Sequence, residues 1–180
     1  MSENIPVYNL LAIICAIVFG IITVLLPLLN LFGFILLGGF LQYSSPSGVT
    51  NFFWFGLRSP TGIIMPFNSM FPKFQPEILW TILPLWGIAS IILAIIGTIG
   101  ILVPAFSKII GKEPTNFRMA KFGLIAGLFG TIIQWLLFLI GWLLIGELWS
   151  SITNLNILLL GAYLIAWFAL FIGYWSVSKD

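Results

Sequence analysis

The sequence predicts an all-α integral membrane protein in which four transmembrane helices form a bundle within a single domain, residues 1–180. Three observations support this fold class. Of all residues, 61% are hydrophobic and 7% are charged, whereas about a quarter of the residues in a soluble domain are charged. The apolar residues also form four long runs, and each run repeats small residues at helical spacing. This composition excludes a soluble globular enzyme.

The membrane spans are expected at about 7–29, 78–103, 122–145 and 155–175. Each has the length that a tilted helix needs to cross a hydrocarbon core of about 30 Å. The first apolar run extends from Ile5 to Leu41, which is too long for one crossing, so we end the first span between Pro27 and Asn30. No basic residue precedes this run, which indicates an uncleaved first helix rather than a signal peptide.

Basic residues indicate the orientation of the spans. Four of them lie in or at the end of the connection between the second and third spans: Lys108, Lys112, Arg118 and Lys121. Cytoplasmic loops carry an excess of Lys and Arg, so this connection is placed inside. By alternation, both termini are cytoplasmic, and residues 42–77 and the turn at 147–154 lie outside. The predicted location is the cell membrane, with several crossings.

Small residues predict how the helices pack. Lipid provides no hydrophobic force between helices, so bundles depend on close approach of the backbones. Each span carries small residues on one face, and we expect these faces to form the bundle core. They are Ala12, Ala16 and Gly20 in the first span, Gly87, Ala94 and Gly97 in the second, Gly123 and Gly127 in the third, and Ala162, Ala166 and Gly173 in the fourth.

The third span also carries an aromatic stripe and a central polar residue. Trp135, Trp142 and Trp149 recur every seven residues, offset from the glycine face, and are predicted to meet lipid or a partner protein. Gln134 is the candidate intramembrane polar group. A single amide without an ionisable companion is typical of an interhelical hydrogen bond, and the alternative is a transport path.

The loop 42–77 is rich in proline and aromatic residues, among them Trp54 and Phe55. So much apolar surface outside the membrane is expected to lie on the bundle or the bilayer, or to bind another protein. Turn-forming residues at 44–48 separate two apolar runs, 32–40 and 49–57, which are predicted to pair as a hairpin.

The chain lacks the side chains of most catalytic and metal sites. It has no His and one Cys, Cys15, and its one Asp is Asp180. Zinc, non-haem iron, copper and His-ligated haem sites and Ser-His-Asp catalysis need imidazole or clustered thiolates and carboxylates. We therefore predict no catalytic, cofactor-binding or metal-binding residue and no cofactor.

The layout resembles that of tetraspan membrane proteins of the claudin and peripheral myelin protein type. Four spans, internal termini, a long first outer loop and a short second one are shared. Trp54-Phe55-Gly56-Leu57 matches part of that family's loop motif, a Trp followed by Gly-Leu-Trp and two cysteines. Arg58 replaces the second Trp, and the loop has no cysteine, so the family's disulfide is absent. The resemblance implies a non-catalytic role in packing or adhesion.

The leading functional hypothesis is a non-enzymatic structural or accessory subunit of a larger integral membrane complex, for which a respiratory or other bioenergetic assembly would be a natural host. Its expected partners are membrane lipids and larger integral membrane subunits or further copies of itself, and no nucleic acid. One alternative is a small oligomeric channel or transporter. The other is a tetraspan-like protein that organises cell contacts or the envelope.

Overall fold

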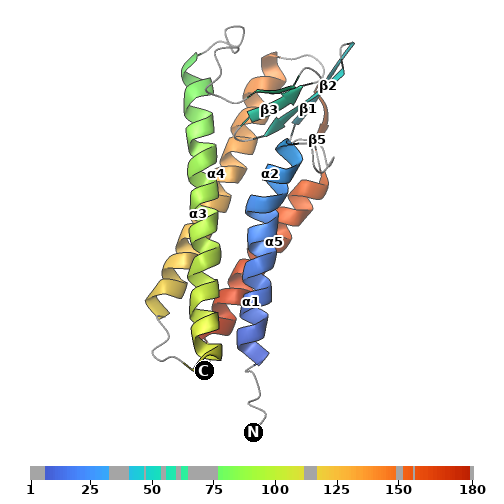
Figure 1. Ribbon diagram of the computed structural model, residues 1–180. Coiled ribbons are helices and arrows are strands. Elements are labelled where there is room, and N and C mark those ends of the chain that lie inside the picture. Colours follow the sequence, from blue (N-terminus) through green and yellow to red (C-terminus); the bar gives the residue numbers. More distant parts are fainter. Residues whose placement is uncertain are drawn as a thin grey trace. The chain divides into compact units, whose positions relative to one another are not determined.

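The chain forms helices that include four candidate membrane spans. The computed structural model describes residues 7–32, 41–46, 48–53, 56–59, 62–64, 77–111, 117–148, 152–155 and 157–178. Four helical segments of this part are long and apolar enough to cross a membrane, namely Val7–Leu29, Leu85–Ile109, Phe117–Leu137 and Gly161–Ser178. The prediction of four membrane-spanning helices is therefore confirmed by length and composition (Figure 1).

The helices in chain order are α1 (Val7–Gly20), α2 (Leu26–Leu31), α3 (Glu77–Ile109), α4 (Phe117–Leu148) and α5 (Ile157–Ser178). Helices α3 and α4 extend into the connection predicted between them, so Lys108 lies in the last turn of α3, and Arg118 and Lys121 lie near the start of α4. Gly111 ends α3 with a positive φ of 71°, and its N–H donates to the Lys108 carbonyl at 3.2 Å.

A π-helical turn, η1 (Ile21–Leu25), joins α1 to α2 within the first span. Pro27 gives this turn a local cause. Proline has no N–H, and its ring clashes with the carbonyl four residues earlier, which here belongs to Thr23. The wider π turn separates the ring from that carbonyl. The Thr23 hydroxyl donates to the Phe19 carbonyl at 2.7 Å and so remains hydrogen-bonded inside the helix.

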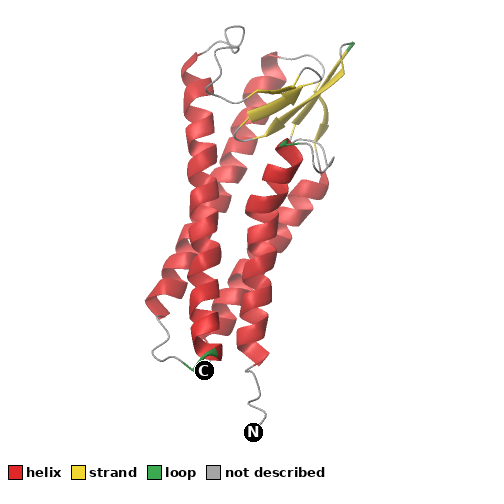
Figure 2. Ribbon diagram, viewed as in Figure 1, coloured by secondary structure: helices red, strands yellow, loops and turns green. Residues whose placement is uncertain are grey.

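The described loop residues form a five-stranded antiparallel sheet that the all-α prediction did not include (Figure 2). The first four strands come from the first loop, and the last comes from the connection between α4 and α5. They are β1 (Leu41–Ser45), β2 (Gly48–Phe53), β3 (Gly56–Ser59), β4 (Gly62–Ile64) and β5 (Ile152–Leu155). The order is β4-β3-β2-β1-β5.

The hairpin of β1 and β2 differs from the predicted one in both strands, since β2 ends at Phe53 and residues 56–57 of the predicted run 49–57 belong to β3. Ser45 pairs with Gly48, so the strands directly flank the turn, and β1 covers 41–45 instead of the predicted 32–40. Residues 33–40 lie outside the described residues. Gly48 has a φ of 124°, which a glycine adopts without the steric cost of a Cβ. Pairing of Gln42 with Asn154 joins β1 to β5.

The chain consists of two compact units, within each of which most residue contacts are made. The helical unit comprises Met1–Val24, Ile91–Thr131 and Gly161–Asp180. The sheet unit comprises Leu25–Ser90 and Ile132–Leu160, and it includes all five strands. The helical unit contains the segments of the spans nearest the termini and the α3–α4 connection.

Candidate functional site

Two glycine pairs bring the backbones of α3 and α4 into contact in the helical unit. A Cβ added at Gly97 would lie 2.7 Å from the Cα of Gly127, and a Cβ added at Gly123 would lie 2.7 Å from the Cα of Gly100. Real Cβ atoms do not approach backbone atoms this closely. This crossing therefore requires glycine, as expected for helices that associate in lipid through close backbone approach.

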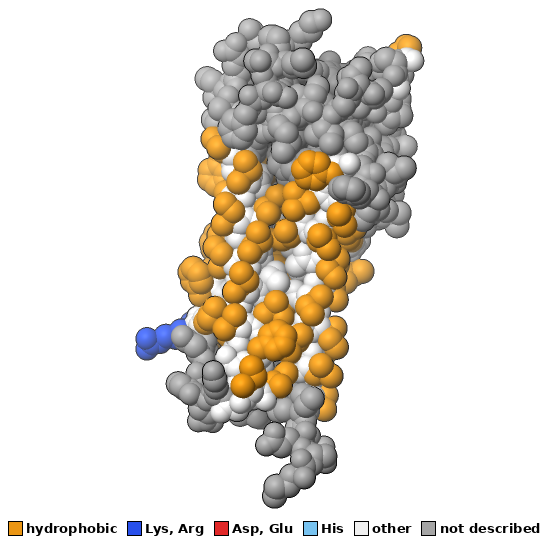
Figure 3. Space-filling model, viewed as in Figure 1, with side chains coloured by type: hydrophobic (Ala, Val, Ile, Leu, Met, Phe, Trp, Pro, Cys, Tyr) orange, Lys and Arg blue, Asp and Glu red, His pale blue; other side chains and the backbone are white. Residues whose placement is uncertain are grey.

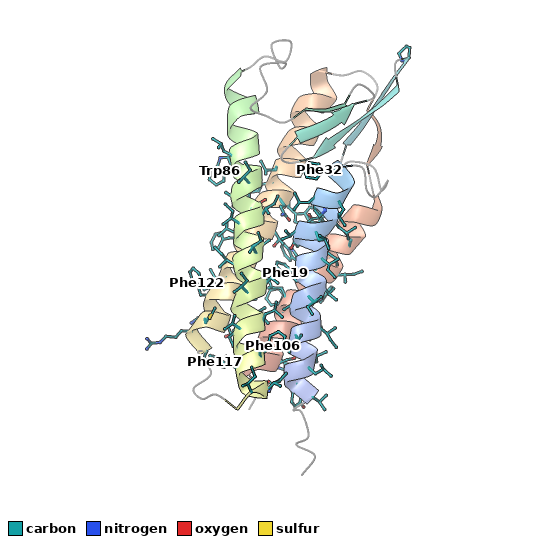
Figure 4. All side chains as sticks on the ribbon, viewed as in Figure 1. Phe19, Phe32, Trp86, Phe106, Phe117 and Phe122 are labelled. Carbon is teal, nitrogen blue, oxygen red and sulfur yellow. The ribbon has the colours of Figure 1, made fainter. Side chains whose placement is uncertain are left out.

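Helices α1 and α5 complete the core of the helical unit. A Cβ at Gly173 would lie 3.3 Å from the Cβ of Cys15 and 3.3 Å from a methyl carbon of Ile101, so α5 packs against α1 and α3. A Cβ at Gly127 would lie 3.2 Å from Cζ of Phe19, whose ring is fully buried. Figure 4 shows Phe19 on α1, directed among the neighbouring helices. All four helical segments thus meet around small residues.

Most of the predicted packing residues are buried. Ala12, Ala16, Ala94 and Ala166 have no exposed surface, Gly87, Gly97, Gly123, Gly127 and Gly173 are buried, and Gly20 and Ala162 are half-buried. Gly87 belongs to the sheet unit, where its carbonyl accepts a hydrogen bond from the Ser90 hydroxyl at 2.6 Å. Gly100 also lies at this crossing and was not among the predicted packing residues. Its spacing of three residues from Gly97 was the available signal, because this spacing places both on one helix face.

Buried hydroxyl groups donate hydrogen bonds within their own helices. The Thr131 hydroxyl lies 3.0 Å from the carbonyls of Gly127 and Leu128, and the Thr98 hydroxyl lies 2.9 Å from the Ala94 carbonyl. Such bonds to the preceding turn satisfy polar groups where a membrane interior offers no water. These threonines are therefore part of the packed helices.

The predicted polar and aromatic candidates are only partly described. Gln134 is 1% exposed and Trp135 is half-buried, and both belong to the sheet unit. The backbone of Trp142 belongs to α4, but its side chain lies outside the described residues. Trp54, Phe55 and Trp149 lie wholly outside them. A continuous aromatic stripe over Trp135, Trp142 and Trp149 stays a prediction.

Contacts at one end of the helical unit connect the helix termini. The Lys108 ammonium on α3 donates a hydrogen bond to the Val177 carbonyl on α5 at 3.0 Å. The C-terminal end of a helix carries partial negative charge, so the ammonium also interacts favourably with the dipole of α5. Tyr8 on α1 meets Trp175 on α5 edge to face, with ring centroids 6.0 Å apart. Further contact between the rings of Phe117 and Tyr174 joins the start of α4 to α5.

Exposed apolar side chains lie on all four long helical segments, and Figure 3 shows them gathered on one face of the molecule. Exposed examples are Leu10, Ile14 and Ile17 on α1, Ile92, Ile95 and Ile99 on α3, Phe122, Ile125 and Phe129 on α4, and Leu164, Ile165 and Phe168 on α5. Lipid or another apolar surface must cover faces of this kind. Among the described residues, no group of three or more His, Cys, Asp or Glu could hold a metal ion.

Comparisons of the chain with protein-family models, with curated proteins and with solved structures find no match. The resemblance to tetraspan proteins of the claudin and peripheral myelin protein type therefore stays a prediction, based on the layout of the spans and on the loop residues Trp54 to Leu57.

Proposed function

We propose that the protein is a non-enzymatic structural subunit of the cell membrane, with both termini cytoplasmic, which packs against larger integral membrane proteins or further copies of itself. The observation that carries this proposal is the sheet, whose strands come both from the segment before α3 and from the α4–α5 connection. Strand β5 comes from the connection between α4 and α5, yet it pairs with β1 from the first loop. One ordered surface thus combines the two loops.

The edges of this sheet support a role in binding other proteins. β4 and β5 are the terminal strands, and each pairs with a single strand within the described residues. A terminal strand has backbone N–H and C=O groups on its outer side that another chain can pair with, so a protein must either cover such an edge or use it. A partner subunit that pairs with β4 would use this edge and cover it at the same time.

A tetraspan-like protein of cell contacts or the envelope is the second candidate. The same pairing of β1 with β5 favours it, because a joint surface of both loops suits contact with a neighbouring membrane protein. The channel or transporter alternative has less support. The hydroxyls of Thr23, Thr98 and Thr131 donate to carbonyls of their own helices, which leaves them poorly suited to bind a passing solute.

Purification of the full tagged chain from its native membrane in a mild detergent tests the proposal. A stoichiometric set of larger membrane proteins on a native gel, identified by mass spectrometry, would support the subunit role. A homogeneous oligomer of this chain alone would favour the contact protein. Recovery of a lone monomer would contradict both.

Two matched substitutions connect the result to the sheet edge. Ile63→Lys places a charge in the terminal strand β4, where lysine opposes edge-to-edge pairing, and is expected to reduce recovery of the partner. Ile110→Lys makes the same chemical change at a residue that is 66% exposed at the end of α3. It is expected to leave partner recovery unchanged.

A further inference from the structure

One face of α4 in the helical unit begins with two basic residues and continues with apolar ones. Arg118 and Lys121 are exposed. Phe122, Ile125 and Phe129 follow on the same face and are 62%, 44% and 58% exposed. Figure 3 shows basic side chains beside a surface that is otherwise hydrophobic, and Figure 4 shows Phe122 on this part of α4.

The two basic residues lie where the helix itself disfavours them. The N-terminus of a helix carries partial positive charge, so anionic groups are favoured there and cations are not. The first turn of α4 contains no acidic residue. No ion pair with Arg118 or Lys121 is present in the part of the chain that the structure describes. An anion between these two side chains would therefore lower the electrostatic energy of this end of the helix.

The apolar continuation of the face has the length of one lipid leaflet. At 1.5 Å per residue, Lys121 and Phe129 are about 12 Å apart along the helix axis. Half of a bilayer hydrocarbon core is about 15 Å thick. A lipid with its headgroup at the basic pair would therefore lay its acyl chain along the three exposed apolar side chains.

We propose that this face of α4 binds an anionic phospholipid. The Arg118 guanidinium and the Lys121 ammonium hold the headgroup phosphate, the former through its planar fork of N–H donors and the latter as a point charge. Phe122, Ile125 and Phe129 contact the acyl chain. This binding does not depend on the proposed subunit role, since it needs only the helical unit in a bilayer.

The test is a titration of the purified full chain in a neutral detergent, with bound lipids counted by native mass spectrometry. Phosphatidylglycerol and phosphatidylcholine with the same acyl chains are compared. We expect wild-type protein to bind phosphatidylglycerol more tightly. The double substitution R118Q/K121Q is expected to weaken phosphatidylglycerol binding about thirtyfold, since each basic side chain near an anionic surface contributes about fivefold in affinity. Phosphatidylcholine binding should remain unchanged.

Two further variants separate headgroup from chain contacts. R58Q/K73Q removes the same charge from the first loop and is expected to bind both lipids as wild type does. Phe122→Ala is expected to weaken the binding of both lipids equally, because it removes a contact with the acyl chain and leaves the charge of the protein unchanged. All variants are compared at equal helix content by circular dichroism.

Four results would overturn the proposal. The first is equal affinity of wild-type protein for the two lipids. The second is wild-type affinity of R118Q/K121Q for phosphatidylglycerol. The third is a loss of phosphatidylglycerol affinity in R58Q/K73Q as large as that in R118Q/K121Q. Such a result would mean that the overall charge of the protein attracts the lipid. The fourth is displacement of the lipid by millimolar inorganic phosphate, because the pair would then bind a free anion without need of the apolar face.

Discussion

Single glycines determine how closely α3 and α4 approach each other. At Gly97 and Gly123 an added methyl group would meet backbone atoms of the opposite helix, which cannot rotate away as a side chain can. At Gly161 an added methyl group would meet nothing within 4 Å. The same substitution therefore has opposite expected effects at two helical positions of one chain.

Gly97→Ala is expected to lower the free energy of unfolding by about 1–3 kcal/mol, because the helices must separate to admit the methyl group. Gly161→Ala is the matched control and is expected to raise it by about 0.5–1 kcal/mol through the higher helix propensity of alanine. Equilibrium unfolding of the purified protein in mixed detergent–SDS micelles, followed by circular dichroism, measures both. Equal stability of the two variants would contradict the close contact of Gly97 with Gly127.

Cys15 offers a direct measure of packing between α1 and α5. Its side chain is 8% exposed, and Gly173 lies against it. We expect a maleimide to label Cys15 slowly in the folded protein and fully after denaturation in SDS. Gly173→Leu should accelerate labelling under native conditions, because its larger side chain must displace α1. Rapid labelling of the folded wild type would contradict this packing.

At the scale of elements, the helices could be predicted more completely than the strands. Long apolar runs predict spans directly, because only a helix satisfies its backbone hydrogen bonds alone in lipid. The helix ends were less predictable. Lys108 and Arg118 were assigned to the loop between the second and third spans, but they lie within α3 and α4. Strand β5 has only four residues, and its partner β1 lies far away in the sequence, so local alternation carries no signal for their pairing.

At the candidate site, too, the sequence predicts only some of the residues. The small residues of the core, such as Ala16 and Gly127, follow from helical spacing. The large buried residues Phe19, Leu170 and Tyr163 do not, because an aromatic or aliphatic side chain suits lipid and protein interior equally. Only the arrangement of the helices in the helical unit distinguishes these residues from exposed ones such as Phe168.

The pairing of β1 with β5 can be tested by a disulfide. Gln42 and Asn154 are directly paired, so cysteines at both positions are expected to form a disulfide in a Cys15→Ser background. Gln42→Cys with Leu155→Cys is the control, because neighbouring residues of a strand point to opposite faces. A mobility shift on a non-reducing gel measures the product. Efficient oxidation of the control pair, or none of the test pair, would contradict the register.

At the scale of the whole molecule, the sheet constrains the topology of the chain. Strand β1 follows the first span and β5 precedes the fourth, so their pairing requires both loops on the same side of the membrane. An odd number of crossings between them is incompatible with this pairing. The two helices between them, α3 and α4, satisfy the condition when each crosses the membrane once.

Single cysteines in a Cys15→Ser background test this topology. A membrane-impermeant maleimide added to intact cells is expected to label Ser44→Cys and Ser151→Cys, and to label Thr115→Cys only after lysis, because the positive-inside rule places the α3–α4 connection in the cytoplasm. Labelling of Ser44→Cys and Ser151→Cys from different sides would contradict the sheet. Labelling of all three in the reverse sense would contradict only the proposed orientation.

The sheet also orders events during biosynthesis. The ribosome completes β1 through β4 before α3 emerges, but β5 follows only after α3 and α4 have been translated. Until then the β1 edge stays open, because its final neighbour has not been translated. Nascent chains stalled before β5 would keep this edge unpaired, and an unpaired strand edge is liable to associate with other chains. Closure of the sheet in this protein is thus expected to depend on the short α4–α5 connection, although that connection contributes only one strand of four residues.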